Sequence, residues 1–129
     1  MHKKIVISGV IFAMLAVVLG AFGAHGLKSL LTIEALATFE VGVRYQMYHA
    51  LALIFIGLSG KLPDTTTHTT ALLFTLGILL FSGSIYLLSL QEALVFNASG
   101  IGFITPLGGA CFIFGWCYFL WKIITLKSI

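Results

Sequence analysis

Hydrophobic residues form long continuous runs along this chain, separated by short polar stretches. The runs cover residues 5–24, 41–60, 70–90 and 101–121. Each is about 20 residues long, and a helix of that length rises roughly 30 Å, which matches the hydrocarbon core of a bilayer. Because the runs are continuously apolar and do not alternate with polar residues, they predict four transmembrane α-helices and exclude a β-barrel.

The polar stretches between the runs predict how the spans are connected. Residues 61–69 and 91–100 are short, so neighbouring spans are expected to be antiparallel within a single membrane domain covering residues 1–129. Before the second run, Thr32 is a suitable N-cap for a helix that begins at Ile33, with Glu34 in its first turn. We therefore expect a short interfacial helix between the first two spans, which runs on into the second.

Composition supports a membrane protein. The chain is 60% hydrophobic and 9% charged, whereas soluble domains carry roughly 25% charged residues. The net charge of +3 does not indicate a nucleic-acid partner, because the basic residues form no common face. Most of them would lie on one side of the bilayer if both termini were cytoplasmic, as the positive-inside rule favours. They are Lys3, Lys4, Lys61, Lys122 and Lys127, against Lys28 and Arg44 on the other side.

Small residues predict close helix packing. On a helix that turns 100° per residue, the first run places its small residues in one narrow stripe: Gly9, Ala13, Ala16, Gly20 and Gly23. Such a stripe forms a groove for another helix, either in the same chain or in a second copy, so a homo-oligomer is plausible. In the fourth run, Pro106 predicts a kink.

Polar residues gather in the outer half of the predicted bundle, while the inner half has few. This asymmetry predicts a polar cluster that binds a ligand. The candidate residues are His25, Glu40, Arg44, Tyr45, Gln46, Tyr48, His49, Ser82, Tyr86 and Thr105.

The second run carries most of this cluster. Glu40 and Arg44 are four residues apart, the favourable order for a helix ion pair. They share an arc of the helix with Tyr45, Tyr48 and His49, which leaves the opposite face to lipid. The predicted lipid face consists of Val43, Met47, Ala50 and Ile54. An arginine at this depth should be paired or should extend towards the headgroups, and a buried imidazole should be uncharged and hydrogen-bonded.

Two histidines leave a cofactor open as an alternative. His25 and His49 are expected at similar depths on neighbouring helices, where they could bind a haem iron or share a metal ion. No third ligand or flanking pattern supports such a site. The preferred interpretation is therefore a protein without a cofactor, and haem is kept as an alternative.

Four stretches resemble a known family. They are LGAFGAHGL (residues 19–27), YQMYHALAL (45–53), FSGSIYLL (81–88) and TPLGGACFIFGW (105–116). They are similar to the domain of unknown function 423 family, whose eukaryotic relatives are called transmembrane protein 256. The resemblance implies a small four-span protein of bacterial type, and hence the cytoplasmic membrane. It brings no activity, cofactor or catalytic residue with it.

These observations favour a non-enzymatic membrane protein that binds a small ligand, a lipid or a partner helix at the outer polar cluster. One alternative is a subunit of a transporter for a small solute or protons, although the apolar inner half provides no continuous polar route. Another is a bis-histidine haem or metal protein. An enzyme is disfavoured, because no nucleophile arrangement or metal-ligand set can be recognised.

Overall fold

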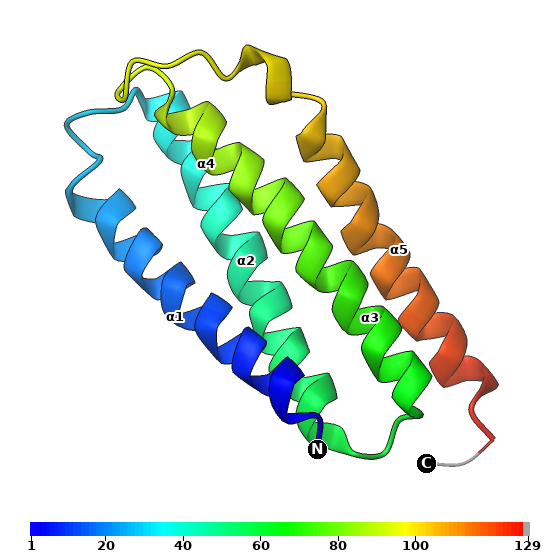
Figure 1. Cartoon of the computed structure of the whole chain (residues 1–129). Coiled ribbons are helices and arrows are strands. Elements are labelled where there is room, and N and C mark those ends of the chain that lie inside the picture. Colours follow the sequence, from blue (N-terminus) through cyan, green and yellow to red (C-terminus); the bar gives the residue numbers. More distant parts are fainter. Residues whose placement is uncertain (128–129) are drawn as a thin grey trace.

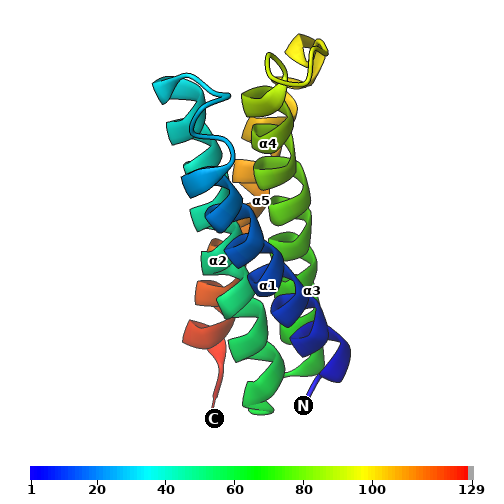
Figure 2. The ribbon, with the colours of Figure 1, turned by 90° about the vertical axis from the view of Figure 1, so that its left-hand side faces the viewer.

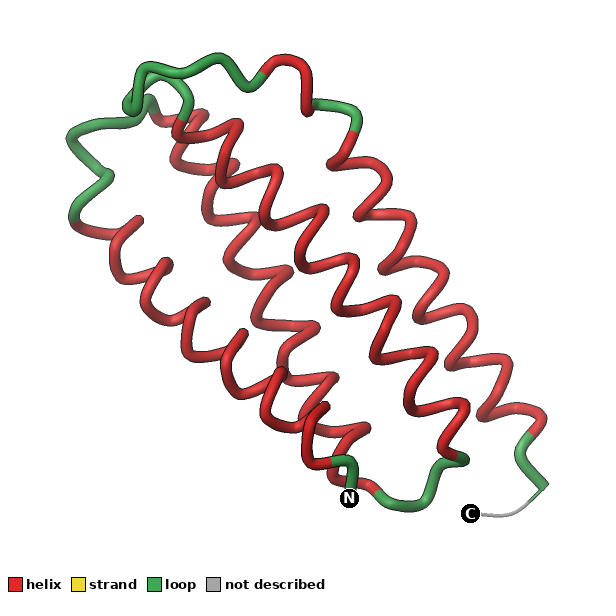
Figure 3. Tube along the Cα trace, viewed as in Figure 1, coloured by secondary structure: helices red, strands yellow, loops and turns green. Residues whose placement is uncertain are grey.

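The computed structural model describes residues 1–127, and all regular elements in that part of the chain are helices (Figures 1 and 3). A π-helical turn, η1, joins α3 and α4 into one continuous helix from Asp64 to Leu90. The elements are α1 (Lys3–His25), α2 (Ile33–Ser59), α3 (Asp64–Gly77), η1 (Ile78–Ser82), α4 (Gly83–Leu90), the 3₁₀ turn η2 (Ser99–Ile101) and α5 (Ile104–Thr125).

Four helical segments in the described residues are long and apolar enough to cross a membrane, as the sequence predicts. The chain passes back and forth along the bundle, and both termini lie at the same end as the connection between α2 and α3 (Figure 1). The connections between α1 and α2 and between α4 and α5 lie at the other end. We call these the terminal end and the loop end.

The second spanning helix begins earlier than the apolar run suggests. The Thr32 side chain accepts a hydrogen bond of 3.1 Å from the Ala35 backbone N–H, so the predicted N-cap is present. From there α2 continues without interruption to Ser59, and the expected short helix is the first part of α2, not a separate element. The helix ends at Gly60, whose positive φ of 60° favours glycine.

The stripe of small residues on α1 packs against α2 within the same chain. Gly9, Ala16 and Gly23 are buried. A Cβ on Gly9 would lie 2.8 Å from the Ala50 carbonyl oxygen and 3.0 Å from the Ile54 nitrogen, so the two backbones are in direct contact there. The predicted helix groove is therefore filled by α2, and a homo-oligomer would need a different surface.

This contact shows that the predicted lipid face of α2 is wrong. Ala50 is fully buried, and Val43 and Ile54 face the glycines of α1. The exposed side of α2 instead carries Tyr48, Leu51 and Phe55. The small stripe of α1 selects this face, because a helix without a hydrophobic driving force associates where the backbones can approach most closely.

On the far side of the bundle from α1, α5 packs against α3 and η1 (Figure 2). Gly108 lies directly on the backbone of Leu80 and Phe81, within the π-helical turn. Below it, Gly77 of α3 faces Phe112, and Gly115 faces Phe74. These glycines alternate with aromatic rings between the two helices, which gives the close contact that membrane helices require.

The kink predicted at Pro106 does not occur as expected. Helix α5 begins at Ile104, so Pro106 lies in its first turn. Backbone N–H groups have no intrahelical partner there, and proline is tolerated. The irregularity lies instead in the third spanning segment, where the π-helical turn inserts one extra residue into the helix.

Candidate functional site

The structure divides the predicted polar cluster into an interior group and an exposed group. Side chains of the interior group are buried or half-buried and hydrogen-bonded: Gln46, His49, Ser82, Tyr86 and Thr105. Those of the exposed group lie on the outside of the bundle: His25, Glu40, Arg44, Tyr45 and Tyr48. The predicted residues therefore do not form one enclosed site.

Gln46 connects three helices at the centre of the interior group. Its Nε2 donates to the Phe12 carbonyl oxygen of α1 at 2.8 Å. Its Oε1 accepts from the Tyr86 hydroxyl of α4 at 2.6 Å. Only 3% of Gln46 is exposed. Because both ends of the amide are engaged, this side chain acts as an interhelical link.

Two further hydrogen bonds complete the interior group. The Ser82 hydroxyl, at the end of the π-helical turn, donates to the Gly42 carbonyl oxygen of α2 at 2.7 Å. The Ser84 and Thr105 hydroxyls lie 2.6 Å apart and connect α4 to α5. These pairs satisfy one another's polar atoms, so they stabilise helix packing and leave little capacity to bind a ligand.

His49 is held between α2 and α5. Its Nδ1 lies 2.7 Å from the Tyr45 carbonyl oxygen, and its Nε2 lies 2.9 Å from the Trp116 indole nitrogen. A carbonyl can only accept and an indole N–H can only donate, so the arrangement requires a proton on Nδ1 and none on Nε2. His49 is thus a neutral imidazole, and it stacks on Phe112 with ring centroids 3.6 Å apart.

The two histidines do not meet. Gly23 of α1 faces Phe39, and Gly9 faces Ile54, so His25 lies level with the beginning of α2. His49 follows Phe39 by ten residues, roughly 15 Å deeper at 1.5 Å per residue. The expectation that they lie at similar depths is wrong. Both nitrogens of His49 are also engaged, so an iron would have to displace Trp116 or Tyr45.

The exposed group contains two charges in the half of the bundle nearer the loop end. Glu40 and Arg44 border a groove of about 230 Å³ on the outside of α1 and α2. Its other lining residues are Gly20, Gly23, Phe39 and Val43. The predicted ion pair between Glu40 and Arg44 is not formed. Within residues 1–127, the ion pair with a nitrogen–oxygen distance below 4.0 Å is that between His2 and Asp64. Both charges therefore face the surroundings of the protein.

The sequence did not reveal two features. One is that the Trp116 indole donates a hydrogen bond to His49. The nearby Tyr118 and Trp121 rings lie beside Lys122 instead, whose Nζ is 5.6 and 4.6 Å from their centroids. Buried threonines of α3 also place polar groups in the half nearer the termini: Thr66, Thr67 and Thr70. The one sequence feature that points to Trp116 as the partner of His49 is its spacing. It follows Phe112 by four residues, so both rings lie on the same face of α5.

Across residues 1–127, no group of three or more histidine, cysteine, aspartate or glutamate side chains is placed to hold a metal ion. In the same part of the chain, most interior polar side chains are hydrogen-bonded, the buried Thr70 and Ser89 hydroxyls being exceptions without a partner, and the Glu40 and Arg44 charges are on the outside. Four apolar helices with such an interior define an integral membrane protein of the four-helix type.

Comparison with known proteins identifies the family. The family model described as "Protein of unknown function (DUF423)" matches residues 19–109, and the chain belongs to this family. No solved structure matches it.

Similar proteins are bacterial and are named as membrane proteins. The UPF0382 membrane protein YwdK of Bacillus subtilis is 47% identical over 117 residues, covering 88% of this chain and 90% of that protein. A UPF0382 membrane protein of Staphylococcus epidermidis is 41% identical over 125 residues, covering 97% of each chain. One from Haemophilus influenzae is 40% identical over 114 residues, covering 88% of this chain and 87% of that protein.

Proposed function

We propose that this protein is a non-catalytic, lipid-binding protein of the bacterial cytoplasmic membrane, with both termini in the cytoplasm. Its binding site would be the groove at Glu40 and Arg44, in the outer half of the bundle. The occupant we propose is a phospholipid with a zwitterionic phosphoethanolamine headgroup. The observation that carries this proposal is the pair of unpaired, exposed charges on a membrane-spanning helix.

Depth is the first argument for a headgroup. Gly20 of α1 faces Val43 of α2. Arg44, the next residue of α2, therefore lies at about the level of Gly20, which is five residues before the end of α1 at His25. This is roughly 8 Å below that end, within reach of an extended arginine side chain. A charged side chain in this position is costly unless a partner of opposite charge is present, and a lipid phosphate supplies one.

The order of the charges is the second argument. In a phosphoethanolamine headgroup the phosphate is attached to the glycerol and the ammonium group lies further out. Arg44 is the deeper residue, and Glu40 lies one turn nearer the loop end. The phosphate would therefore accept from Arg44 and the ammonium would donate to Glu40. Gly20, Gly23 and Val43 line the same groove, which would take the start of an acyl chain.

Charge distribution supports the proposed orientation. The terminal end carries Lys3, Lys4, Lys61, Lys122 and Lys127, whereas the loop end and its adjoining half carry Lys28 and Arg44 together with Glu34, Glu40 and Glu92. The positive-inside rule places the lysine-rich end in the cytoplasm.

Reporter fusions test this orientation. A green fluorescent protein fused after residue 127 should fluoresce in a bacterial host, and alkaline phosphatase fused at the same place should be inactive. The opposite result is expected for fusions within residues 94–97 of the connection between α4 and α5. Active phosphatase at the C-terminal fusion would refute the proposed orientation.

Native mass spectrometry tests the headgroup. Wild-type protein in detergent should retain phosphatidylethanolamine, and Arg44→Gln should reduce retention roughly fivefold, the effect of one interfacial charge of about 1 kcal/mol. Glu40→Gln should reduce the preference for phosphatidylethanolamine over phosphatidylglycerol, because only the former carries an ammonium group.

Two exposed charges outside the groove provide matched controls for this experiment. Lys28→Gln and Glu34→Gln change the same charges near the same end of the bundle. Both should leave the lipid preference unchanged. Equal effects of Lys28→Gln and Arg44→Gln would show a general charge effect, and the proposed site would be wrong.

A further inference from the structure

A second groove lies between α1 and α3 near the terminal end, well away from Glu40 and Arg44. Its volume is about 220 Å³. Apolar side chains form most of its lining, and polar side chains are contributed by both helices. The apolar residues are Ile5, Leu53, Ala71 and Leu72, and the polar ones are Lys4, Ser8, His68 and Thr75.

This groove exists because α1 packs on α2 and makes little contact with α3. A second cavity of about 230 Å³ follows between α1 and the same spanning helix, towards the loop end. Phe12, Leu15, Ile78 and Leu79 are among its lining residues. The two cavities follow the same pair of helices, so an extended apolar chain could lie along them.

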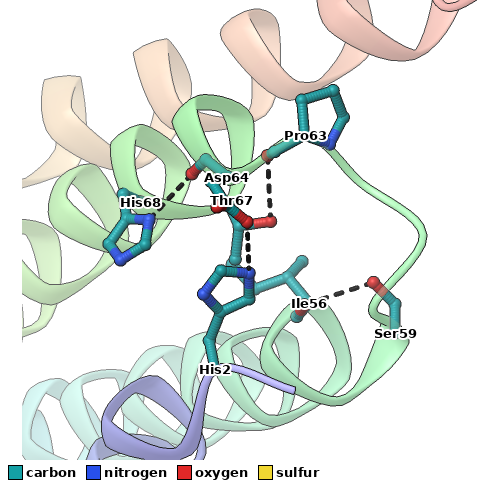
Figure 4. A network of polar contacts seen from close by, with 7 residues as sticks. All are labelled: His2, Ile56, Ser59, Pro63, Asp64, Thr67 and His68. Carbon is teal, nitrogen blue, oxygen red and sulfur yellow. Dashed lines mark hydrogen bonds and ion pairs between the residues drawn. The ribbon is translucent and has the colours of Figure 1, made fainter.

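A network of polar contacts holds the mouth of the groove in place (Figure 4). The His2 backbone N–H donates to the Gly57 carbonyl oxygen at 2.8 Å, and His2 Nε2 lies 3.3 Å from an Asp64 carboxylate oxygen. The His2 and His68 rings meet edge to face with centroids 4.9 Å apart. The first contact joins the start of α1 to the end of α2, and the other two join it to the start of α3. Lys4 and His68 therefore lie on opposite walls of one groove.

The charges at this mouth favour an anion. Lys3 and Lys4 are exposed basic side chains. His68 Nδ1 lies 2.8 Å from the Asp64 carbonyl oxygen, which can only accept, so Nδ1 carries a proton. The other ring nitrogen, Nε2, belongs to an exposed side chain that lines the groove. The negative charge nearest to this mouth is the Asp64 carboxylate. It is in contact with the His2 ring, which lies between it and the start of α1.

We propose that this groove binds an anionic phospholipid of the cytoplasmic leaflet. Its phosphate would lie between Lys4 and His68, and one acyl chain would follow the apolar floor between α1 and α3. A basic mouth above an apolar groove between spanning helices is the chemistry that recognises such lipids. This site is distinct from the proposed phosphoethanolamine site, because it lies at the opposite end of the bundle and uses different charges.

The test measures retention of phosphatidylglycerol by native mass spectrometry in the Arg44→Gln background, where the other proposed site is weakened. Phosphatidylglycerol should be retained more strongly than phosphatidylcholine. Lys4→Gln should weaken its retention roughly fivefold, and Lys4→Gln combined with His68→Gln should weaken it further. Retention of both lipids to the same extent in all variants would overturn the proposal.

The matched control is Lys122→Gln, which removes one positive charge from the same end of the bundle on α5. Lys122 lies over the Tyr118 and Trp121 rings, outside the groove. It should leave retention unchanged, and an effect equal to that of Lys4→Gln would refute a local site. Glycerol 3-phosphate should compete poorly, and competition equal to that of the lipid would refute the role of the acyl chain.

Discussion

Replacing Gly108 with alanine is expected to separate α5 from the rest of the bundle. A Cβ at this position would overlap the Phe81 backbone nitrogen and lie 2.7 Å from the Leu80 carbonyl carbon and Phe81 Cα. Backbone atoms cannot change rotamer to avoid a methyl group, so the helices would have to move apart. Overpacking of this kind costs about 3 kcal/mol or more, and would also weaken the hydrogen bond between Ser84 and Thr105.

The neighbouring glycine is a matched control. A Cβ on Gly109 would lie 3.7 Å from the nearest atom, a carbon of the Phe81 ring, which is an ordinary van der Waals distance. In detergent, the midpoint for thermal unfolding should fall strongly for Gly108→Ala and little for Gly109→Ala. If the two variants unfold at the same temperature, the close contact between α5 and the π-helical turn does not exist in the protein.

Gln46→Leu is expected to have the second largest effect. The substitution removes the hydrogen bonds to the Phe12 carbonyl oxygen and from the Tyr86 hydroxyl. The Tyr86 hydroxyl would lose its partner in the half-buried interior. Interhelical hydrogen bonds in membranes contribute roughly 0.6 kcal/mol each on average, and an unsatisfied buried hydroxyl costs about 1–3 kcal/mol. We therefore expect a loss of about 2 kcal/mol in the free energy of unfolding.

A double-mutant cycle with Tyr86→Phe separates the two contributions. Tyr86→Phe alone should cost less than Gln46→Leu, because Gln46 keeps its bond to Phe12. The double variant should be more stable than the sum of the single losses predicts, since no hydroxyl is left without a partner. The measurement is unfolding by increasing SDS in mixed micelles. Additive losses would show that the two side chains do not interact.

The two proposed lipid sites have a common physical origin. In both, charges that have no partner among the spanning helices border a groove lined by apolar residues or glycines, one at each end of the bundle. By contrast, most interior polar side chains of residues 1–127 are hydrogen-bonded to another side chain or to a backbone carbonyl, with the Thr70 and Ser89 hydroxyls as exceptions. Polar residues inside this bundle therefore stabilise helix packing, and the charged residues outside it are those available for binding.

The sequence by itself determined the four spanning helices, because continuous apolar runs of about 20 residues have no other stable arrangement in a bilayer. It also identified the Thr32 cap, the packing stripe of α1 and the family. Each of these depends on residues close together in the chain or repeated at the period of a helix.

Only the tertiary structure decided which side of each helix faces inwards. The polar arc of α2 predicted that Glu40, Arg44 and Tyr48 point into the bundle, but the backbone contact between Gly9 and Ala50 turns that face outwards. The bond from Trp116 to His49 joins residues 67 positions apart, and periodicity cannot predict such a pair. Helix rotation depends on the fit between two surfaces, and that fit is a property of the packed pair of helices.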